Sequence, residues 1–200
     1  MKKISLLLIL LLAVLILPAA TVTIFEEGFE GTFPGEKTTV NGDPTWDDNN
    51  HTAKTGSWSA WCSGTYYDDW DEYEDYIYGY EDGEESFHYQ DEMEAKLVFG
   101  PFDLSSYSSA TLSFASLVST EEDYDYLVVN IVRNLPENQE ESPIHRESGE
   151  GEELWNEHSI SLNEYLGSTP IFISFEFHSD SSEHSYLGAW IDDVKLVGTR

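Results

Sequence analysis

Two neighbouring carboxylates near the C-terminal end of the chain, Asp192 and Asp193, have the chemistry of cation ligands. In an extended strand Asp192 shares one face with Val194 and Leu196, because successive side chains alternate between faces. If those two apolar residues face the core, Asp192 faces inward as well. A buried carboxylate without a partner costs several kcal/mol, and few basic side chains lie near it in the sequence. A Ca²⁺ ion, which prefers oxygen ligands, would supply the missing partner.

Further carboxylates lie early in the chain. Glu27 and Glu30, each followed by a glycine, become co-ligands if the first strand lies beside the last. The resulting hypothesis is a structural Ca²⁺ site formed by Glu30 with Asp192 or Asp193, with Glu27 and Asp47 as additional candidates. The alternative is that these carboxylates are ordinary surface groups, or that they accept hydrogen bonds from backbone amides.

A second candidate site lies at about residues 66–96, where tyrosines and a tryptophan are interleaved with acidic residues. Aromatic rings stack on sugars or on partner side chains, while carboxylates bind cations or accept hydrogen bonds from hydroxyl groups. Connections of this length are more often functional or disordered than neutral. The ligand-binding candidates are Trp70, Tyr73, Tyr76 and Tyr78. The alternative is a solvated excursion, for example an extra hairpin that turns at residues 81–83.

No set of catalytic residues stands out. The six histidines are scattered without an HExxH pair, and the chain has no GxSxG elbow, P-loop or dinucleotide fingerprint. Acidic residues are so numerous that no glycosidase-like pair can be chosen. Cys62, the only cysteine, lies in an apolar run and is predicted to be a buried core residue. These observations predict a protein that is not an enzyme.

The elements that must position these residues are predicted to be strands. Alternation is clearest at 171–177, where Ser174 and Glu176 occupy the polar face of a half-buried strand, and residues 126–132 read as a strand buried on both faces. Further strands are predicted at 21–25, 57–63, 95–102, around 112–114, at 158–162 and at 188–197. The acid-rich segment 137–153 is interpreted as a loop. Many strands separated by turns, without helical periodicity, predict a two-sheet sandwich or barrel.

Residues 1–20 have the layout of a secretory signal peptide, with two lysines before an apolar stretch. That stretch is shorter than the roughly 20 residues of a membrane span, although an uncleaved anchor is the alternative. Residues 21–200 are predicted to form one domain that carries the 66–96 insertion. The net charge of −30 repels nucleic acids and anionic lipids, and leaves cations, cationic partners and neutral ligands.

Four blocks in a fixed order carry a resemblance to known secreted domains. They are FEEGFEGTFPG at 25–35, TGSWSAWCSG at 55–64, LVFGPFDLSSYSSATLSF at 97–114 and FEFHSDSSEHSYLGAWIDDVKL at 175–196. The chain resembles the jelly-roll accessory domain of immune-inhibitor-A-like secreted metalloproteases and the related choice-of-anchor J, MAM-like adhesin domains. The resemblance implies an all-β jelly-roll sandwich of two antiparallel sheets, an extracellular setting and a structural Ca²⁺ between an early Glu and a late Asp. It does not imply proteolysis.

The expected function is that of a secreted or cell-surface, calcium-stabilised binding module for carbohydrate or an extracellular protein. Nucleic acid binding and membrane insertion of the mature domain are not expected. One alternative is a structural, adhesin or filament-forming subunit that forms homo-oligomers through sheet edges, with residues 21–25 as a donor strand. Another is an accessory or inhibitory partner of a secreted protease.

Overall fold

The computed structural model describes residues 19–63, 78–81, 84–134, 139–149, 154–168, 170–182 and 186–200. The predicted signal peptide lies almost entirely outside the described residues. The described part of the chain is built from strands and one short 3₁₀ helix, η1 (Asn163–Tyr165). It contains no helix that is long and apolar enough to cross a membrane.

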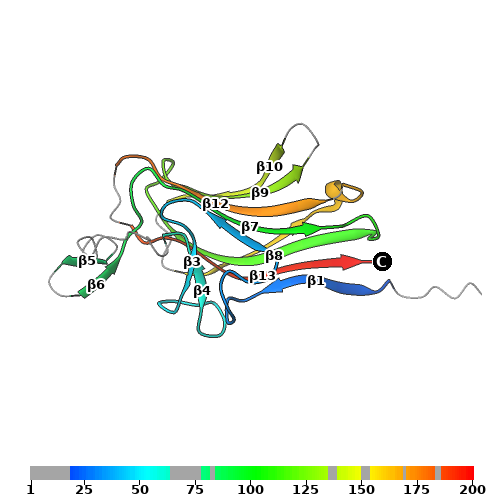
Figure 1. The fold of residues 1–200 in the computed structure, drawn as a ribbon, viewed down its shortest axis with the longest axis horizontal. Helices are drawn as coiled ribbons and strands as arrows, with labels where there is room; N and C mark the ends of the chain where they lie inside the picture. Colours follow the sequence, from blue (N-terminus) through cyan, green and yellow to red (C-terminus); the bar gives the residue numbers. More distant parts are fainter. Residues whose placement is uncertain are drawn as a thin grey trace, which may run out of the picture.

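One layer of the fold is a six-stranded antiparallel sheet (Figure 1). Its order is β11 (Asn156–Ser161), β8 (Ser109–Ser119), β13 (Gly188–Thr199), β4 (Ser59–Trp61) and β3 (Asp47–Asn49), with β1 (Thr21–Glu27) also paired to β13. The strands β1 and β4 share one edge of β13, because β4 pairs with Trp190 and Ile191 whereas β1 pairs with residues 194–199. The first and last strands are therefore neighbours, as the calcium hypothesis requires.

The second layer is a five-stranded antiparallel sheet. Its order is β10 (Gln139–Glu147), β9 (Tyr126–Asn134), β12 (Ile171–His178), β7 (Glu94–Phe102) and β2 (Thr38–Asn41). A separate hairpin of β5 (Tyr78–Glu81) and β6 (Glu84–Phe87) lies beyond one end of the two sheets (Figure 1). Its strands flank the turn that the sequence predicts. The predicted fold class, a sandwich of two antiparallel sheets, is confirmed.

The core between the sheets follows the predicted alternation. Ile171, Ile173, Phe175 and Phe177 are fully buried. Aromatic rings from the two layers interlock, since Phe114 of β8 meets Phe175 of β12 edge-on with ring centroids 5.1 Å apart. Cys62 is fully buried, as predicted, and burial raises the pKa of its thiol.

Three sequence-based interpretations need correction. Residues 139–147 are not a loop but strand β10, which pairs with β9; its acidic residues suit an edge strand, where one side of the backbone meets water. Ser174 and Glu176 do lie on the other face of β12 from Phe175, yet both are buried by their neighbours, whereas Phe172 and His178 on that face are partly exposed. Tyr89 and Met93, inside the predicted insertion, are core residues because the chain returns to the sandwich before β7 begins.

Candidate functional site

Three of the predicted calcium ligands, Glu30, Asp192 and Asp193, lie around a bulge in β13, but among the described residues no three of the predicted carboxylates have oxygens within 4.8 Å of one another. The register between β13 and β8 shifts between Asp192 and Lys195, and Asp193 has a positive φ of 50°. The bulge lies where β4 ends and β1 begins along the same edge of β13. The extra residue reverses the alternation, so Asp192 lies on the face of Ala115 and Lys195 and not on that of Val194 and Leu196. The predicted shared inward face is therefore wrong: Asp192 is fully buried, but beneath the loop at residues 54–55 on the outer face of the sheet, and Asp193 is half-buried.

Backbone amides surround the Asp192 carboxylate. Its Oδ2 accepts hydrogen bonds from the amides of Lys54 and Thr55 at 2.8 and 3.1 Å, and its Oδ1 accepts one from the amide of Asp193 at 2.6 Å. Burial raises the pKa of Asp192, and the charge of Asp193 adds to this rise, whereas the amide hydrogen bonds oppose it. The same loop is held by Asp193, whose Oδ1 accepts a 2.7 Å hydrogen bond from the Thr55 hydroxyl.

Glu30 binds the next residues of that loop. Its Oε1 accepts hydrogen bonds from the amides of Ser57 and Trp58 at 2.7 and 2.8 Å, and these bonds lower its pKa. Glu30, Asp192 and Asp193 are thus brought together through one segment, residues 54–58. The alternative interpretation, that these carboxylates accept hydrogen bonds from backbone amides, describes what they do in this structure. Calcium binding by the same groups stays a prediction.

Glu27 and Asp47 belong to a second acidic group at the same end of β1. Glu27 accepts a 2.7 Å hydrogen bond from the Phe29 amide. Burial raises the pKa of Asp48, and the neighbouring charges of Asp47 and Glu27 raise it further. This repulsion between like charges is the feature of the region that a bound cation would relieve.

The structure tells little about the aromatic residues that are predicted to bind a ligand. Trp70, Tyr73 and Tyr76 lie outside the described residues. Tyr78 opens strand β5, where its backbone pairs with that of Phe87. Sugar binding by these residues stays a prediction.

A polar groove that the sequence reasoning missed lies on the outer face of the five-stranded sheet. The groove has a volume of about 280 Å³. It crosses β2, β7, β12 and β9, since strand pairing aligns Asn41, Lys96 and Glu176 in one row and Thr39, Val98 and Ser174 in the next. Phe172 supplies an aromatic wall. The only signal in the sequence was the polar parity of Ser174 and Glu176.

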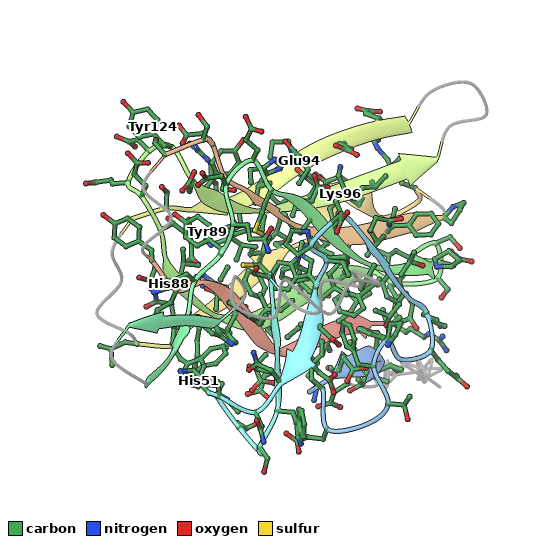
Figure 2. The ribbon with its side chains drawn as sticks, turned by 60° about the vertical axis from the view of Figure 1, so that its left-hand side comes forward. His51, His88, Tyr89, Glu94, Lys96 and Tyr124 are labelled. Carbon is green, nitrogen blue, oxygen red and sulfur yellow. The ribbon has the colours of Figure 1, made fainter. Side chains whose placement is uncertain are left out.

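Glu176 is the charged centre of this groove, with a side chain that is 4% exposed. The ammonium group of Lys96 lies 2.8 Å from its Oε2 and 3.4 Å from Glu141 Oε1. Burial alone would raise the pKa of Glu176, but hydrogen bonds from His178 and Lys96 outweigh it and hold the pKa at about 2. Figure 2 labels Lys96 together with Glu94, which shares its face of β7.

A stack of side chains lies beside Glu176 on the same face of the sheet. His178 Nδ1 lies 2.7 Å from Glu94 Oε2, and contact with Glu176 and Glu94 raises the pKa of this imidazole despite its burial. The imidazole stacks on Tyr126 at a centroid distance of 4.9 Å, and the Arg146 guanidinium lies 4.0 Å from the same phenol ring. The stack fixes the side chains next to Glu176.

Two polar atoms in the groove make no well-formed hydrogen bond to the protein. Glu176 Oε1 and Ser174 Oγ are buried and lack a partner with hydrogen-bond geometry among the described residues, although the Ser174 and Asn130 side chains are close enough to Glu176 to help lower its pKa. Buried polar atoms are nearly always paired, so such atoms at the base of a groove indicate a place for water or for ligand hydroxyl groups. The arrangement is suited to hydrogen bonding with a polar ligand.

Two other groups of potential ligand side chains occur among the described residues. Glu121, Asp125 and Asp180 gather beside Tyr89, whose hydroxyl hydrogen bonds to the fully buried Asp125. The other Asp125 oxygen accepts a 2.7 Å hydrogen bond from the Asp180 amide, so this carboxylate is already satisfied. The second group, His145, Glu147 and His158, lies between the sheets. Neither includes a residue from the predicted calcium set.

No protein-family model matches the sequence, and no curated protein matches it. Solved structures do match. The K1 cleaved adhesin domain of Lys-gingipain from Porphyromonas gingivalis W83 is 14% identical with a TM-score of 0.51, over 88% of this chain and 97% of that domain. The CBM22-1 xylan-binding domain from Paenibacillus barcinonensis Xyn10C is 11% identical with a TM-score of 0.55, over 90% and 96% of the two chains.

The C-terminal family 22 carbohydrate-binding module of Clostridium thermocellum Xyn10B is also similar, at 12% identity and a TM-score of 0.54, over 88% of this chain and 92% of that module. The chain has the β-sandwich fold of these adhesin and carbohydrate-binding domains. At such low identity the likeness concerns the fold, so the function must be argued from the groove.

Proposed function

We propose that the protein is a non-catalytic carbohydrate-binding module whose ligand lies in the groove on the outer face of the five-stranded sheet. The observation that carries this proposal is the pair of buried polar atoms at its base, Glu176 Oε1 and Ser174 Oγ, which make no well-formed hydrogen bond to the described residues. A carboxylate oxygen accepts a hydrogen bond from a sugar hydroxyl, and a serine hydroxyl can donate or accept one. Similar sandwich folds in adhesins and xylan-binding modules support the choice of ligand class.

The groove is already ordered before a ligand arrives. Lys96 and His178 contact Glu176 and hold it in place. Asn41 and Thr39 of β2 lie beside this group, because β2 pairs with β7. A preorganised site loses little side-chain entropy on binding. Phe172 gives the sugar ring an apolar surface, which complements the polar base.

Neutral polysaccharides are the favoured ligands. The chain has 39 acidic residues against 9 basic ones, so its field repels anionic polymers. Within the groove, Lys96 is already paired with Glu176 and Glu141 and does not offer a free positive charge to a carboxylated sugar. Xylans and glucans without acidic substituents therefore make suitable probes.

Affinity electrophoresis in gels that contain neutral polysaccharides tests the proposal. Phe172→Ala removes the aromatic wall and should abolish retention of the protein. Trp58→Ala, which removes an exposed ring from the loop held by Glu30, is the matched control and should leave retention unchanged. Absence of retention on every neutral polysaccharide, with and without Ca²⁺, or equal retention of both variants, would count against the groove as a sugar site.

Calcium is proposed to stabilise the module at the β13 bulge. The carboxylates of Glu30, Asp192 and Asp193 converge on residues 54–58, and Glu27 with Asp47 adds negative charge beside them. Oxygen-only donors of this kind suit Ca²⁺. A thermal melt should show a lower midpoint in chelator than in Ca²⁺; identical midpoints would remove calcium from the proposal. A secreted or cell-surface location is also proposed, because similar sandwich folds occur in adhesin and xylan-binding domains.

The strand-donor alternative has less support from the fold. Thr21–Phe25 is paired with β13 of its own chain, and the Arg200 amide donates a 3.0 Å hydrogen bond to the Ala20 carbonyl beyond it. Donation of this strand to a second chain would require those bonds to break first. The carbohydrate proposal requires no such rearrangement.

A further inference from the structure

Two histidines and a glutamate meet between the sheets, at the side of the sandwich where β10 and β11 are the outermost strands. His145 and Glu147 come from β10 in the five-stranded sheet, and His158 comes from β11 in the six-stranded sheet. Opposite residues in antiparallel strands share a face. Glu147 lies opposite Leu127 and His158 lies opposite Phe114, both of which are core residues, so the cluster faces the interior.

The geometry of the cluster centres on one carboxylate oxygen. Glu147 Oε1 lies 3.3 Å from His145 Nε2 and 3.0 Å from His158 Nε2. One ligand atom from each of the three residues lies within 4.8 Å of the others. In a tetrahedral zinc site with bonds of about 2.0–2.1 Å, neighbouring ligand atoms are about 3.3–3.4 Å apart. The two nitrogen-to-oxygen distances are therefore close to those that a metal ion would need.

Neighbouring side chains hold this arrangement in place. Ser116 Oγ donates a 2.5 Å hydrogen bond to Glu147 Oε2 and lies 2.8 Å from His158 Nε2. Phe114 stacks on the His158 ring with centroids 4.6 Å apart. A hydrogen bond to the outer oxygen of a carboxylate orients the inner oxygen toward a metal. Ser116 thus leaves Glu147 Oε1 directed at the two imidazoles.

One nitrogen of the cluster is held only by a poorly aligned contact. His145 Nε2 is buried and lies 3.3 Å from Glu147 Oε1 without the geometry of a full hydrogen bond to any described residue. The three side chains are only 14–22% exposed, which leaves solvent access but little freedom to move. His145 Nε2 faces a carboxylate and a second imidazole, and in the tautomer that carries the proton on Nδ1 it has the lone pair that a metal ion requires.

We propose that His145, Glu147 and His158 bind one divalent transition-metal ion, which clasps the outermost strands of the two sheets together. Imidazole nitrogen favours Zn²⁺, Cu²⁺ and Ni²⁺ over Ca²⁺, so the site differs in chemistry from the carboxylates at the β13 bulge. Three protein ligands leave a fourth position for water. The site is also separate from the sugar groove, which lies on the outer face of the five-stranded sheet.

Calorimetric titration of the metal-free full chain with Zn²⁺ tests the clasp. Excess Ca²⁺ is present throughout, so that oxygen-only sites are occupied. We expect one Zn²⁺ per chain, and a loss of at least tenfold in affinity for His145→Gln and for His158→Gln. The matched control is His178→Gln, because His178 also lies between two glutamates but on the outer face, and it should bind Zn²⁺ as the wild type does.

Unchanged affinity in the two clasp variants, or a loss confined to His178→Gln, would overturn the proposal. A milder substitution, Ser116→Ala, tests the proposal if His145→Gln and His158→Gln do not fold. Ser116→Ala should weaken Zn²⁺ binding about tenfold, since it removes only the orienting hydrogen bond. Electron paramagnetic resonance of the folded wild type with one equivalent of Cu²⁺ should show nitrogen coupling from two imidazoles. A spectrum with oxygen ligands only would also overturn it.

Discussion

The two outer faces of the sandwich use the same kind of ion pair in different surroundings. On the five-stranded sheet, Lys96 lies 2.8 Å from Glu176, whose side chain is 4% exposed. On the six-stranded sheet, Lys54 lies 2.8 Å from Glu157, whose side chain is 75% exposed. Solvent screens the second pair and side-chain entropy opposes it, so equal distances do not mean equal energies. Burial decides which pair matters to stability.

The larger of the two grooves lies on the outer face of the six-stranded sheet, where its charged side chains pair with one another. A groove of about 420 Å³ on the six-stranded sheet is lined by Glu26, Lys54, Glu157 and Lys195, and its lysines pair with exposed glutamates. The groove over the five-stranded sheet is smaller, but at its base are buried polar atoms that make no well-formed hydrogen bond to the part of the chain that the structure describes. A ligand gains most where it satisfies groups that the protein leaves unpaired. The comparison therefore favours the smaller groove as the binding site.

The largest expected effect comes from the buried pair. Glu176→Gln should lower the free energy of unfolding by about 3 kcal/mol, since lowering a carboxyl pKa from 4.5 to about 2 corresponds to that energy. Urea unfolding at pH 6 measures it. The Glu176 contribution is complete above pH 4.5 and disappears as the pH falls toward 2, so wild type and variant should converge there. A difference that persists at pH 2 would contradict this account.

A substitution of Asp192 at the β13 bulge tests whether burial, and not the sheet on which a carboxylate lies, determines its contribution to stability. Asp192→Ala should destabilise the protein by about 2 kcal/mol even in chelator, because it leaves the amides of Lys54, Thr55 and Asp193 without their acceptor. Thermal or urea unfolding gives the value. Asp193→Ala, which removes only a partly exposed hydrogen bond, is the control and should have a smaller effect. Equal losses would remove burial as the explanation.

A smaller effect is expected at His178, which contacts Glu176. His178→Gln should destabilise the protein by about 1 kcal/mol at pH 6 through loss of its charged contacts with Glu94 and Glu176. The pKa of His178 is raised in the folded state, so its contribution is complete below pH 6.5 and is lost as the pH rises through the folded pKa. The gap between variant and wild type should therefore narrow between pH 6 and pH 9. A gap that widens would reverse the assigned sign.

The smallest effect is expected on the exposed face. Glu157→Gln removes the partner of Lys54 and should leave the unfolding midpoint unchanged, because the carboxylate is solvated with or without the lysine. Differential scanning calorimetry at low and physiological salt is sufficient. A clear drop in midpoint at physiological salt would show that the two faces are less different than their burial indicates.

Much of the fold could be predicted because its signals are local. The alternation at 171–177, the β-branched run at 126–132 and the apolar surroundings of Cys62 each depend on residues that are close in sequence. The strand at 139–147 was missed for the opposite reason. Its composition is that of a loop, and only pairing with β9 makes it a strand. The proximity of the first and last strands was correctly expected from the resemblance.

The amino-acid sequence by itself determined which residues alternate, where the chain turns and that the surface is strongly acidic. Only the tertiary structure decided what those residues meet. The amide partner of Asp192 at Lys54 is 138 positions away, Glu176 is buried because β7 and β9 flank it, and His145 meets His158 only when two sheets face each other. Periodicity is a property of neighbouring residues, whereas partners across sheets depend on how the whole chain closes.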